Sequence, residues 1–144
     1  MARLRARFAS AIREVQHFRD EETVLINPAA IVEVCRFLME SPELSFQFLS
    51  DLCGVHFLER EYTYEVVYHL YSFRNKQRLR LKVRLGPEGR VASVTPVWAG
   101  ANWLEREAYD LVGIHFEGHP DLRRILMPED YDQHPLRRDF PLSG

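Results

Sequence analysis

Cysteine is scarce in this sequence. Cys35 and Cys53 are its two cysteines, and neither lies in a C-x-x-C pair. A protein-bound iron–sulfur cluster usually needs four thiolate ligands, so this chain cannot hold one alone. No signal peptide is visible, which makes a reducing compartment the default. We therefore expect both cysteines to be buried free thiols.

Long apolar runs and an excess of one charge are also missing. No stretch approaches the roughly 20 apolar residues of a membrane-spanning helix. The 19 basic residues are nearly balanced by 21 acidic ones, which argues against a chain that mainly coats nucleic acid. No phosphate-binding glycine loop is present. Hydrophobic residues make up 46% of the sequence, which is enough for the core of one compact domain.

The N-terminal residues are arginine-rich and apolar at regular intervals. Leu4, Phe8, Ile12 and Val15 recur at helical spacing. This periodicity predicts a first amphipathic helix over residues 3–18.

A short strand and a second helix are expected next. Residues 23–26 resemble a strand, and Asn27–Pro28 supplies an N-cap followed by a proline at the first helical position. The second helix should end near residues 41–42. Residues 44–58 are ambiguous, and a strand, a helical turn and a second strand fit them. The apolar face of the second helix would contain Ile31, Val34, Cys35 and Leu38.

The centre of the sequence predicts an antiparallel pair of strands. Residues 62–73 are dense in aromatic and β-branched residues. After a short hairpin connection, residues 78–85 alternate strictly between apolar and basic residues, as a half-buried strand does. Residues 86–89 form a turn, and residues 91–97 are predicted to form a further strand, with Pro96 at its end or edge. The basic stripe consists of Arg78, Arg80, Lys82 and Arg84.

The basic stripe has two interpretations. A solvated strand face is the simpler one, because long charged side chains also protect sheets from aggregation. Nucleic-acid binding is the alternative, but the stacking aromatic signature of RNA-binding sheets is absent. Steep salt dependence of DNA or RNA binding would identify it.

A third helix is predicted over residues 103–112. Asn102 followed by Glu105 approximates a capping box, and Gly113 supplies a left-handed C-terminal residue. Helical geometry places Leu104, Ala108, Leu111 and Val112 on one side. The other side carries Trp103, Arg106, Glu107 and Asp110. A large aromatic residue among charges is typical of an interface anchor.

The following stretch, HFEGHP, resembles a metal site at first sight. A zinc-binding helix places two histidines four apart with a glutamate beside the first. Here Glu117 has the wrong offset from His115, and Gly118 with Pro120 disfavours a helix. We expect a rigid loop in which His119 hydrogen-bonds backbone groups. A metal-dependent hydrolase using His115, Glu117 and His119 is a remote alternative.

The C-terminal part is rich in proline, arginine and apolar residues. Half of the eight prolines follow His119, so regular structure is not expected there. Apolar groups on an extended arm must be buried against this domain or against a partner, and both possibilities stay open. The arginine pairs Arg123–Arg124 and Arg137–Arg138 could bind carboxylates across an interface.

Residues 103–142 carry a long motif that resembles a known family. The motif is W-x-E-R-E-x-x-D-x-x-G-I-x-F-x-G-H-P-x-L-R-R-I-L followed by H-P-L-R-R-D-F-P-L. It is similar to the C subunit, also called the thirty-kilodalton subunit, of respiratory NADH:quinone oxidoreductase (complex I). The upstream stretches FLSDLCGV and YEVVYHLYS resemble the family more loosely. Thr95–Pro96 before the third helix departs from the family pattern.

The resemblance implies an α+β fold. We expect a two-layer domain over residues 1–118, with helices packed on one face of a mostly antiparallel sheet. Residues 119–144 would then be a proline-rich, extended docking arm.

The resemblance also implies a function. This chain would be a subunit of the peripheral arm of complex I, which transfers electrons from NADH through FMN and iron–sulfur clusters to quinone and pumps protons. It would hold no flavin, cluster or metal itself, since these cofactors would lie in partner subunits. Its location would be the cytoplasmic face of the bacterial inner membrane, or the matrix face of a mitochondrion. A membrane-bound hydrogenase or F420H2-type dehydrogenase subunit is the near alternative.

The implied partners are other peripheral-arm subunits, chiefly the D subunit of the quinone pocket, also called the forty-nine-kilodalton type. We expect no direct contact with nucleic acid or membrane. The predicted partner-binding residues are Trp103, Glu105, Arg106, Glu107, Asp110, His119, Pro120, Arg123, Arg124, His134, Arg137, Arg138 and Asp139.

Overall fold

A five-stranded mixed sheet forms the centre of the molecule. The computed structural model describes residues 2–18, 21–58, 60–123 and 134–137. The strand order is β1-β2-β5-β4-β3, and every neighbouring pair is antiparallel except the parallel pair β2–β5. The strands are β1 (Ile12–Phe18), β2 (Glu21–Ile26), β3 (Phe48–His56), β4 (Tyr64–Ser72) and β5 (Gln77–Leu85).

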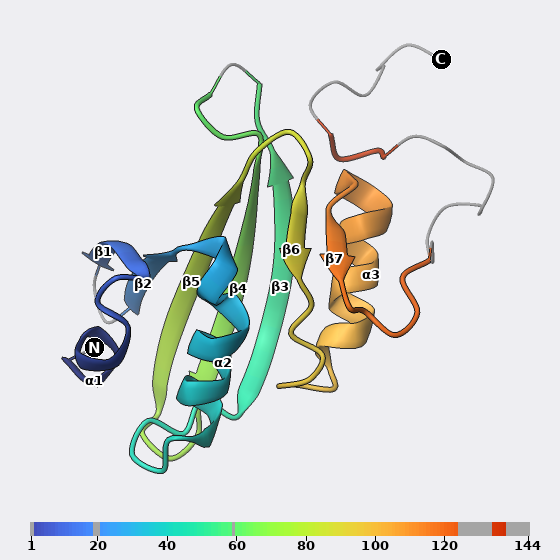
Figure 1. Cartoon of the computed structure of the whole chain (residues 1–144). Coiled ribbons are helices and arrows are strands. Elements are labelled where there is room, and N and C mark those ends of the chain that lie inside the picture. The colour runs from blue at the N-terminus through green and yellow to red at the C-terminus, as the bar shows by residue number, and fades with distance from the viewer. Residues whose placement is uncertain (1, 19–20, 59, 124–133, 138–144) are drawn as a thin grey trace.

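The longer helices pack on one face of this sheet. Helix α2 (Ile31–Glu40) follows a single 3-10 turn, η1 (Pro28–Ala30), and buries Ile31, Val34, Cys35 and Leu38. Helix α3 (Ala101–Val112) lies against β3. A second sheet joins β6 (Arg90–Ala92) to β7 (His115–Glu117) in parallel, and Figure 1 shows it beside α3. The predicted α+β class, with a mostly antiparallel sheet and helices on one face, is confirmed.

Gly54 allows α3 to approach the sheet closely. A Cβ atom at this position would lie 2.5 Å from Ile114 Cδ1 and 3.7 Å from Ala108 Cβ. Both neighbours are buried, so the absence of a side chain at Gly54 lets the α3–β7 layer sit directly on β3.

The opposite face of the sheet is not covered by any helix in the part of the chain that the structure describes. Strict alternation in β5 sends its leucines and Val83 into the core and its cations to this open face. The predicted hairpin of β4 and β5 is confirmed, with Leu70 opposite Leu79 and Tyr71 opposite Arg78. We call the surface that carries the β5 cations the open face.

The predicted first helix over residues 3–18 is wrong beyond its first two turns. Helix α1 spans Ala2–Phe8, and β1 follows after a turn in which Ala11 N–H donates to the carbonyl of Phe8. Ile12 and Val15 lie opposite Ile26 and Val24 of β2, with a register shift in between. That irregularity puts two apolar residues three apart on one strand, which imitates helical spacing.

Two strand predictions also need correction. The ambiguous segment 44–58 contains one strand, β3, whose register shifts between Leu49 and Asp51; this bulge hides the alternation. The predicted strand 91–97 is shorter, because β6 ends at Ala92 and residues 94–98 form turns.

One cysteine prediction is correct and the other is wrong. Cys35 is buried on the core-facing side of α2, and burial raises the pKa of its thiol. Cys53 is exposed, because its position in β3 points to the open face.

Candidate docking surface

Helix α3 carries half of the predicted partner-binding residues that the structure describes. It begins at Ala101 with Gly100 as N-cap, so Asn102 lies within the helix and the predicted capping box is wrong. Glu105 bonds elsewhere: Ser93 Oγ donates to its Oε1 at 2.6 Å, and Val94 N–H donates to its Oε2 at 2.8 Å. These bonds fix the first turns of α3 to the end of the β6 strand.

Glu105 is fully buried. Its two partners are neutral groups, so burial dominates and raises the pKa of the carboxyl from 4.5 to about 7, although both hydrogen bonds oppose the shift. Burial is the main cause of the raised pKa values of Cys35 and Tyr68. The charge of Glu105 raises both values further. A fully buried side chain cannot touch a partner, so Glu105 acts within this domain.

The outer side of α3 presents an exposed tryptophan. The Trp103 side chain is 54% exposed, and the guanidinium of Arg106 lies 5.4 Å from the centre of its ring, within the range of a cation–π contact. Glu107 is partly exposed in the same stretch of helix. The prediction that Trp103 projects with the charged residues is therefore confirmed.

The HFEGHP segment forms a short strand and a turn. Ile114 and Phe116 are buried, while His115 and Glu117 are exposed on either side of Phe116. Asp121 N–H donates to Nδ1 of His119 at 2.9 Å. Nδ1 is therefore an acceptor, and Nε2–H donates to the carbonyl of Asn102 at 2.9 Å. The predicted role of His119 in bonding backbone groups is confirmed.

The alternative of a metal-dependent hydrolase receives no support from this geometry. Both nitrogens of His119 are engaged by the backbone. Within the described ranges, no three histidine, cysteine or acidic side chains cluster in a way that could hold a metal ion.

The C-terminal end of α3 is covered by residues that return from the arm. Gly113 adopts the predicted left-handed conformation, with φ of 93°, and a Cβ there would lie 3.0 Å from the His134 ring. His134 Nδ1–H donates to the carbonyl of Asp110 at 2.9 Å, and Leu136 N–H donates to the carbonyl of Leu111 at 2.7 Å. These bonds satisfy carbonyl groups that the helix itself leaves without a partner.

A second difference from the prediction concerns Asp110. Asp110 was expected on the exposed polar side of α3, but it is fully buried. Residues 134–137 lie at this end of α3 (Figure 1), where His134 also packs against Tyr109 with ring centres 5.8 Å apart. The segment therefore belongs in part to the domain, while Leu136 remains exposed.

The remaining arginines of the arm are only partly described. Arg123 forms an exposed pair with Asp121, with Nε 3.1 Å from Oδ2, and Arg137 lies 6.0 Å from the Tyr64 ring centre. Pro120 is exposed. Arg124, Arg138 and Asp139 lie outside the described residues.

Sequence reasoning missed three positions that shape this region. Ser93 is a small residue in a predicted strand, and Gly54 lies in the ambiguous segment 44–58. Nothing in the local sequence pattern indicates that Gly54 contacts α3, or that Ser93 bonds to Glu105, which lies 12 residues further along the chain. Leu136 follows a proline in the arm, and only its pairing with Leu111 shows where it docks.

None of the helices in the described part of the chain has the length and hydropathy needed to cross a membrane. The class of protein defined by these features is an α+β domain with one covered and one open sheet face and a tail segment that closes its last helix.

The family follows from comparison with known proteins. Residues 24–144 match the family described as "Respiratory-chain NADH dehydrogenase, 30 Kd subunit". The chain therefore belongs to this family, which is the C subunit family of complex I.

Individual relatives agree with this assignment. The NADH-quinone oxidoreductase C subunit of Roseiflexus sp. (strain RS-1) is 52% identical over 145 residues, covering 100% of this chain and 83% of the relative. The NADH-quinone oxidoreductase C 2 subunit of Rhizobium meliloti (strain 1021) is 57% identical over 119 residues, covering 83% of this chain and 65% of the relative. The C subunit of Geotalea uraniireducens (strain Rf4) is 50% identical over 99% of this chain and 86% of the relative.

Solved structures show the same fold. A trypsin-resistant fragment (1-134) of Nqo5 superposes with a TM-score of 0.70 at 31% identity, covering 84% of this chain and 97% of the fragment. A chain of the membrane-bound sulfane sulfur reductase, an archaeal respiratory membrane complex, superposes with a TM-score of 0.82 at 21% identity, covering 99% of this chain and 84% of the other. The second likeness concerns the fold alone.

The predicted resemblance to the C subunit is thus confirmed. This chain is a subunit of the NADH–quinone oxidoreductase complex, associated with the membrane through that complex, and other subunits of the complex are its partners.

Proposed function

We propose that this chain is a structural and assembly subunit of the peripheral arm of complex I, without a cofactor or catalytic group of its own. It docks the D subunit of the quinone pocket through the outer side of α3 and the arm. FMN and the iron–sulfur clusters that carry electrons from NADH to quinone belong to partner subunits. The arm of the complex lies at the cytoplasmic face of the membrane.

The exposed Trp103 carries this proposal. A tryptophan 54% exposed, with an arginine stacked on its ring, presents a large rigid surface and a charge to a partner. Tryptophan and arginine are the residues most enriched among interface positions that dominate binding energy. On the opposite side of the same helix, Glu105 bonds to Ser93, and Ala108 lies beside Gly54 of β3. The tryptophan is therefore carried by a rigid element.

Four of the predicted partner-binding residues are left out of the proposed docking surface, because they are buried or bonded within the domain. Glu105 and Asp110 are buried within the domain, and the His119 and His134 rings are held by backbone groups of α3. These four residues position the surface. The proposed contact residues are Trp103, Arg106, Glu107, Pro120, Arg123, Arg124, Arg137, Arg138 and Asp139.

A substitution at Trp103 tests the proposal in the intact complex. Trp103→Ala should weaken D-subunit retention by about 30-fold, since truncation of a central interface tryptophan costs about 2 kcal/mol or more. The complex is isolated in mild detergent from cells that carry the variant, and the D subunit is quantified against this chain.

Leu58→Ala is the matched control, because Leu58 is 53% exposed in the loop after β3. It should leave D-subunit retention unchanged. Normal retention with Trp103→Ala, or equal losses with both variants, would contradict docking through α3.

A further inference from the structure

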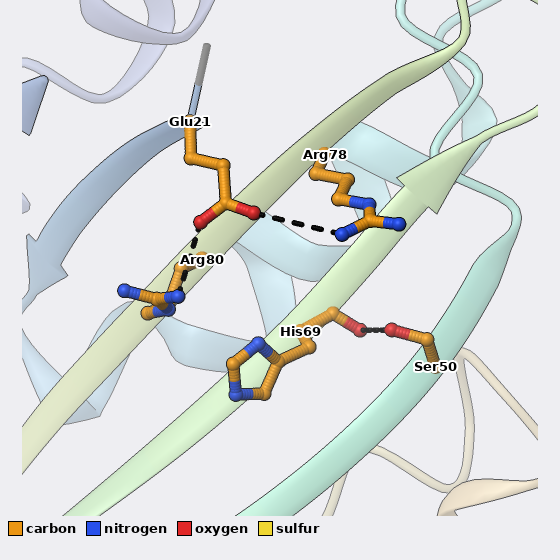
Figure 2. Close-up of polar contacts among 5 residues, drawn as sticks. All are labelled: Glu21, Ser50, His69, Arg78 and Arg80. Carbon is orange, nitrogen blue, oxygen red and sulfur yellow. Dashed lines mark hydrogen bonds and ion pairs between the residues drawn. The ribbon is translucent and has the colours of Figure 1, made fainter. Parts of the chain in front are cut away.

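The carboxyl of Glu105 differs from the carboxylates of the open face in its partners. On the open face, Glu21 lies between Arg78 and Arg80, with nitrogen–oxygen distances of 3.7 and 3.2 Å, as Figure 2 shows. The fully buried Glu105 bonds to neutral donors and forms no ion pair with any cation that the structure describes. A buried carboxyl without a cation favours its protonated form, so this side chain is suited to bind a proton.

The titratable groups that face Glu105 do not supply the missing charge. They are Cys35 of α2 and Tyr68 of β4, and burial raises the pKa of both groups above their ordinary values, so both are neutral near pH 7. The Tyr68 hydroxyl is buried and has no hydrogen-bond partner among the described groups. It therefore does not donate to the carboxylate, whose donors in the described part of the chain are Ser93 Oγ and Val94 N–H.

Two hydroxyl groups connect this buried carboxyl to the surface. Glu105 Oε1 lies 2.6 Å from Ser93 Oγ, and Ser93 Oγ lies 2.8 Å from Thr95 Oγ1. Both are ordinary distances for hydrogen bonds between oxygen atoms. The exposure rises along this row, because Glu105 is fully buried, Ser93 is 3% exposed and Thr95 is partly exposed. The row of hydroxyls therefore extends from the core to the boundary with solvent.

The backbone holds both hydroxyl groups in position. Thr95 N–H donates to Ser93 Oγ at 3.1 Å, and Ser93 N–H donates to the carbonyl of Glu117 in β7 at 2.8 Å. The turn that contains Thr95 is closed by Val97 N–H, which donates to the carbonyl of Val94 at 3.0 Å. The oxygen atoms of the row are therefore fixed, and only their protons need to move.

The row can satisfy its hydrogen bonds in two opposite directions. When Glu105 is ionised, the Thr95 hydroxyl donates to Ser93 Oγ, and the Ser93 hydroxyl donates to Glu105. When Glu105 is protonated, it donates to Ser93 Oγ, and the Ser93 hydroxyl donates to Thr95 Oγ1. In both states Ser93 Oγ also accepts from Thr95 N–H, so it donates one hydrogen bond and accepts two, which is the full capacity of a hydroxyl.

We propose that Glu105 is a buried proton-binding site, and that Thr95 and Ser93 relay its proton from the solvent. A hydronium ion gives a proton to Thr95 Oγ1, the proton of Thr95 passes to Ser93 Oγ, and the proton of Ser93 passes to Glu105 Oε1. Three O–H bonds form and three break, one water molecule is left, and the charge of the hydronium neutralises the carboxylate. Release of the proton follows the same steps in reverse. This proposal does not depend on docking of a partner.

The relay lets the charge beneath α3 follow the pH of the solvent while the domain stays folded. The competing route is local opening of α3, which would expose the carboxyl to water directly. Close packing of Ala108 and Ile114 against Gly54 of β3 opposes such opening. Burial raises the pKa of Glu105 from 4.5 to about 7, so the proton is exchanged near neutral pH.

Infrared spectroscopy of the full chain tests proton binding. A protonated buried carboxyl has a C=O stretching band separate from those of carboxylates. This band should appear as the pH falls from about 9 to about 5, where exposed carboxyl groups stay largely ionised, and it should be missing from Glu105→Gln. If no band in this range is lost in the variant, the site does not bind a proton and the proposal is overturned.

A pH jump followed by time-resolved infrared spectroscopy tests the relay. Thr95→Val nearly keeps the shape of the side chain but removes its hydroxyl. This change should slow protonation of Glu105 about 100-fold, since a positioned proton-transfer group contributes at least that much to a rate. Thr95→Ser is the matched control, because it keeps the hydroxyl and should protonate at the rate of the parent.

The rates of the two variants decide between the relay and local opening. Equal rates in Thr95→Val and the parent would show that protons enter by opening of α3, and this result would overturn the relay. Equal slowing in Thr95→Val and Thr95→Ser would overturn it as well. A loosened fold cannot imitate the expected result, because a helix that opens more often would admit protons faster.

Discussion

The two faces of the five-stranded sheet bury carboxylates in different ways. On the covered side, Glu105 is enclosed completely and bonds to a hydroxyl and a backbone N–H. On the open face, Glu65 is also buried, but its oxygens lie between the cations Lys82 and Arg84. Neutral partners leave the cost of removing a charge from water largely in place, whereas cations offset it. An acidic residue therefore ties α3 to the end of β6 on the covered side, and another lies between two cations on the open face.

The largest expected effect concerns the protonation of Glu105. Its pKa is about 7 in the folded protein against 4.5 for the free side chain, so the folded state keeps its proton to higher pH than the unfolded state does. Stability due to this group is full below about pH 4.5, falls as the pH rises to 7 and is constant above that. The total loss is on the order of 3 kcal/mol.

Glu105→Gln removes this dependence while its side-chain oxygen can still accept from Val94 N–H. Denaturant unfolding of both proteins at pH 5 and pH 8 measures the difference between them. The variant should gain stability relative to the parent at pH 8. Parallel pH profiles would show that the carboxyl of Glu105 does not titrate differently on folding.

Enlargement of neighbouring residues sharpens the contrast between the two faces. Gly54→Ala points a methyl group at Ile114 on the covered side and should cost about 1–3 kcal/mol through overpacking. Cys53→Val enlarges the residue before Gly54, whose side chain lies on the open face. This change should alter the free energy of unfolding by less than about 0.5 kcal/mol. Thermal unfolding of both variants tests this, and equal losses would contradict the assignment of the two faces.

A smaller effect is expected where the tail closes α3. His134→Ala removes the donor to the Asp110 carbonyl and should cost about 0.5–1.5 kcal/mol. His115→Ala is the matched change, since His115 is exposed and its ring centre lies 6.5 Å from Tyr109. Hydrogen exchange of the amides in the last turn of α3 should accelerate in the first variant and stay unchanged in the second. If both variants behave alike, the tail contact does not stabilise the helix.

The smallest effect is expected on the open face. Arg78→Glu should change the stability of the isolated chain by less than about 0.5 kcal/mol, because exposed ion pairs contribute little. A large loss of stability in denaturant unfolding would mean that the ion pairs of the β5 cations hold the sheet together.

The parts of the fold that could be predicted are those whose signals are local. The alternation of leucine with arginine identifies β5, and Gly113 marks the end of α3 because a left-handed residue is needed there. Asn27 accepts a hydrogen bond from Ala29 N–H, so the cap before the second helix was also visible in the sequence. In each case neighbouring residues decide the conformation.

The rest depends on contacts between distant segments. Ile12 and Val15 follow helical spacing, yet pairing with β2 makes them strand residues. Glu105 has the spacing of a capping-box residue, but Ser93 and Val94 provide a different set of donors. The identities of Asn102 and Glu105 cannot reveal these competing partners.

The candidate docking surface also contains both residues that local sequence signals predict and residues that depend on distant contacts. The exposed position of Trp103 follows from helical periodicity, and the backbone role of His119 follows from the glycine and proline around it. Asp110 is buried and residues 134–137 return to the end of α3, and no periodicity encodes either fact.

The parallel pairing of β2 with β5 imposes an order on folding. Val24 of β2 lies opposite Leu81, so on the ribosome the N-terminal hairpin is complete long before its neighbour in the sheet is synthesised. Until β5 emerges, one edge of β2 can pair with other chains, and loop closure over so many residues is slow. The exposed edge of β2 is covered only when β5 has left the ribosome and paired with it.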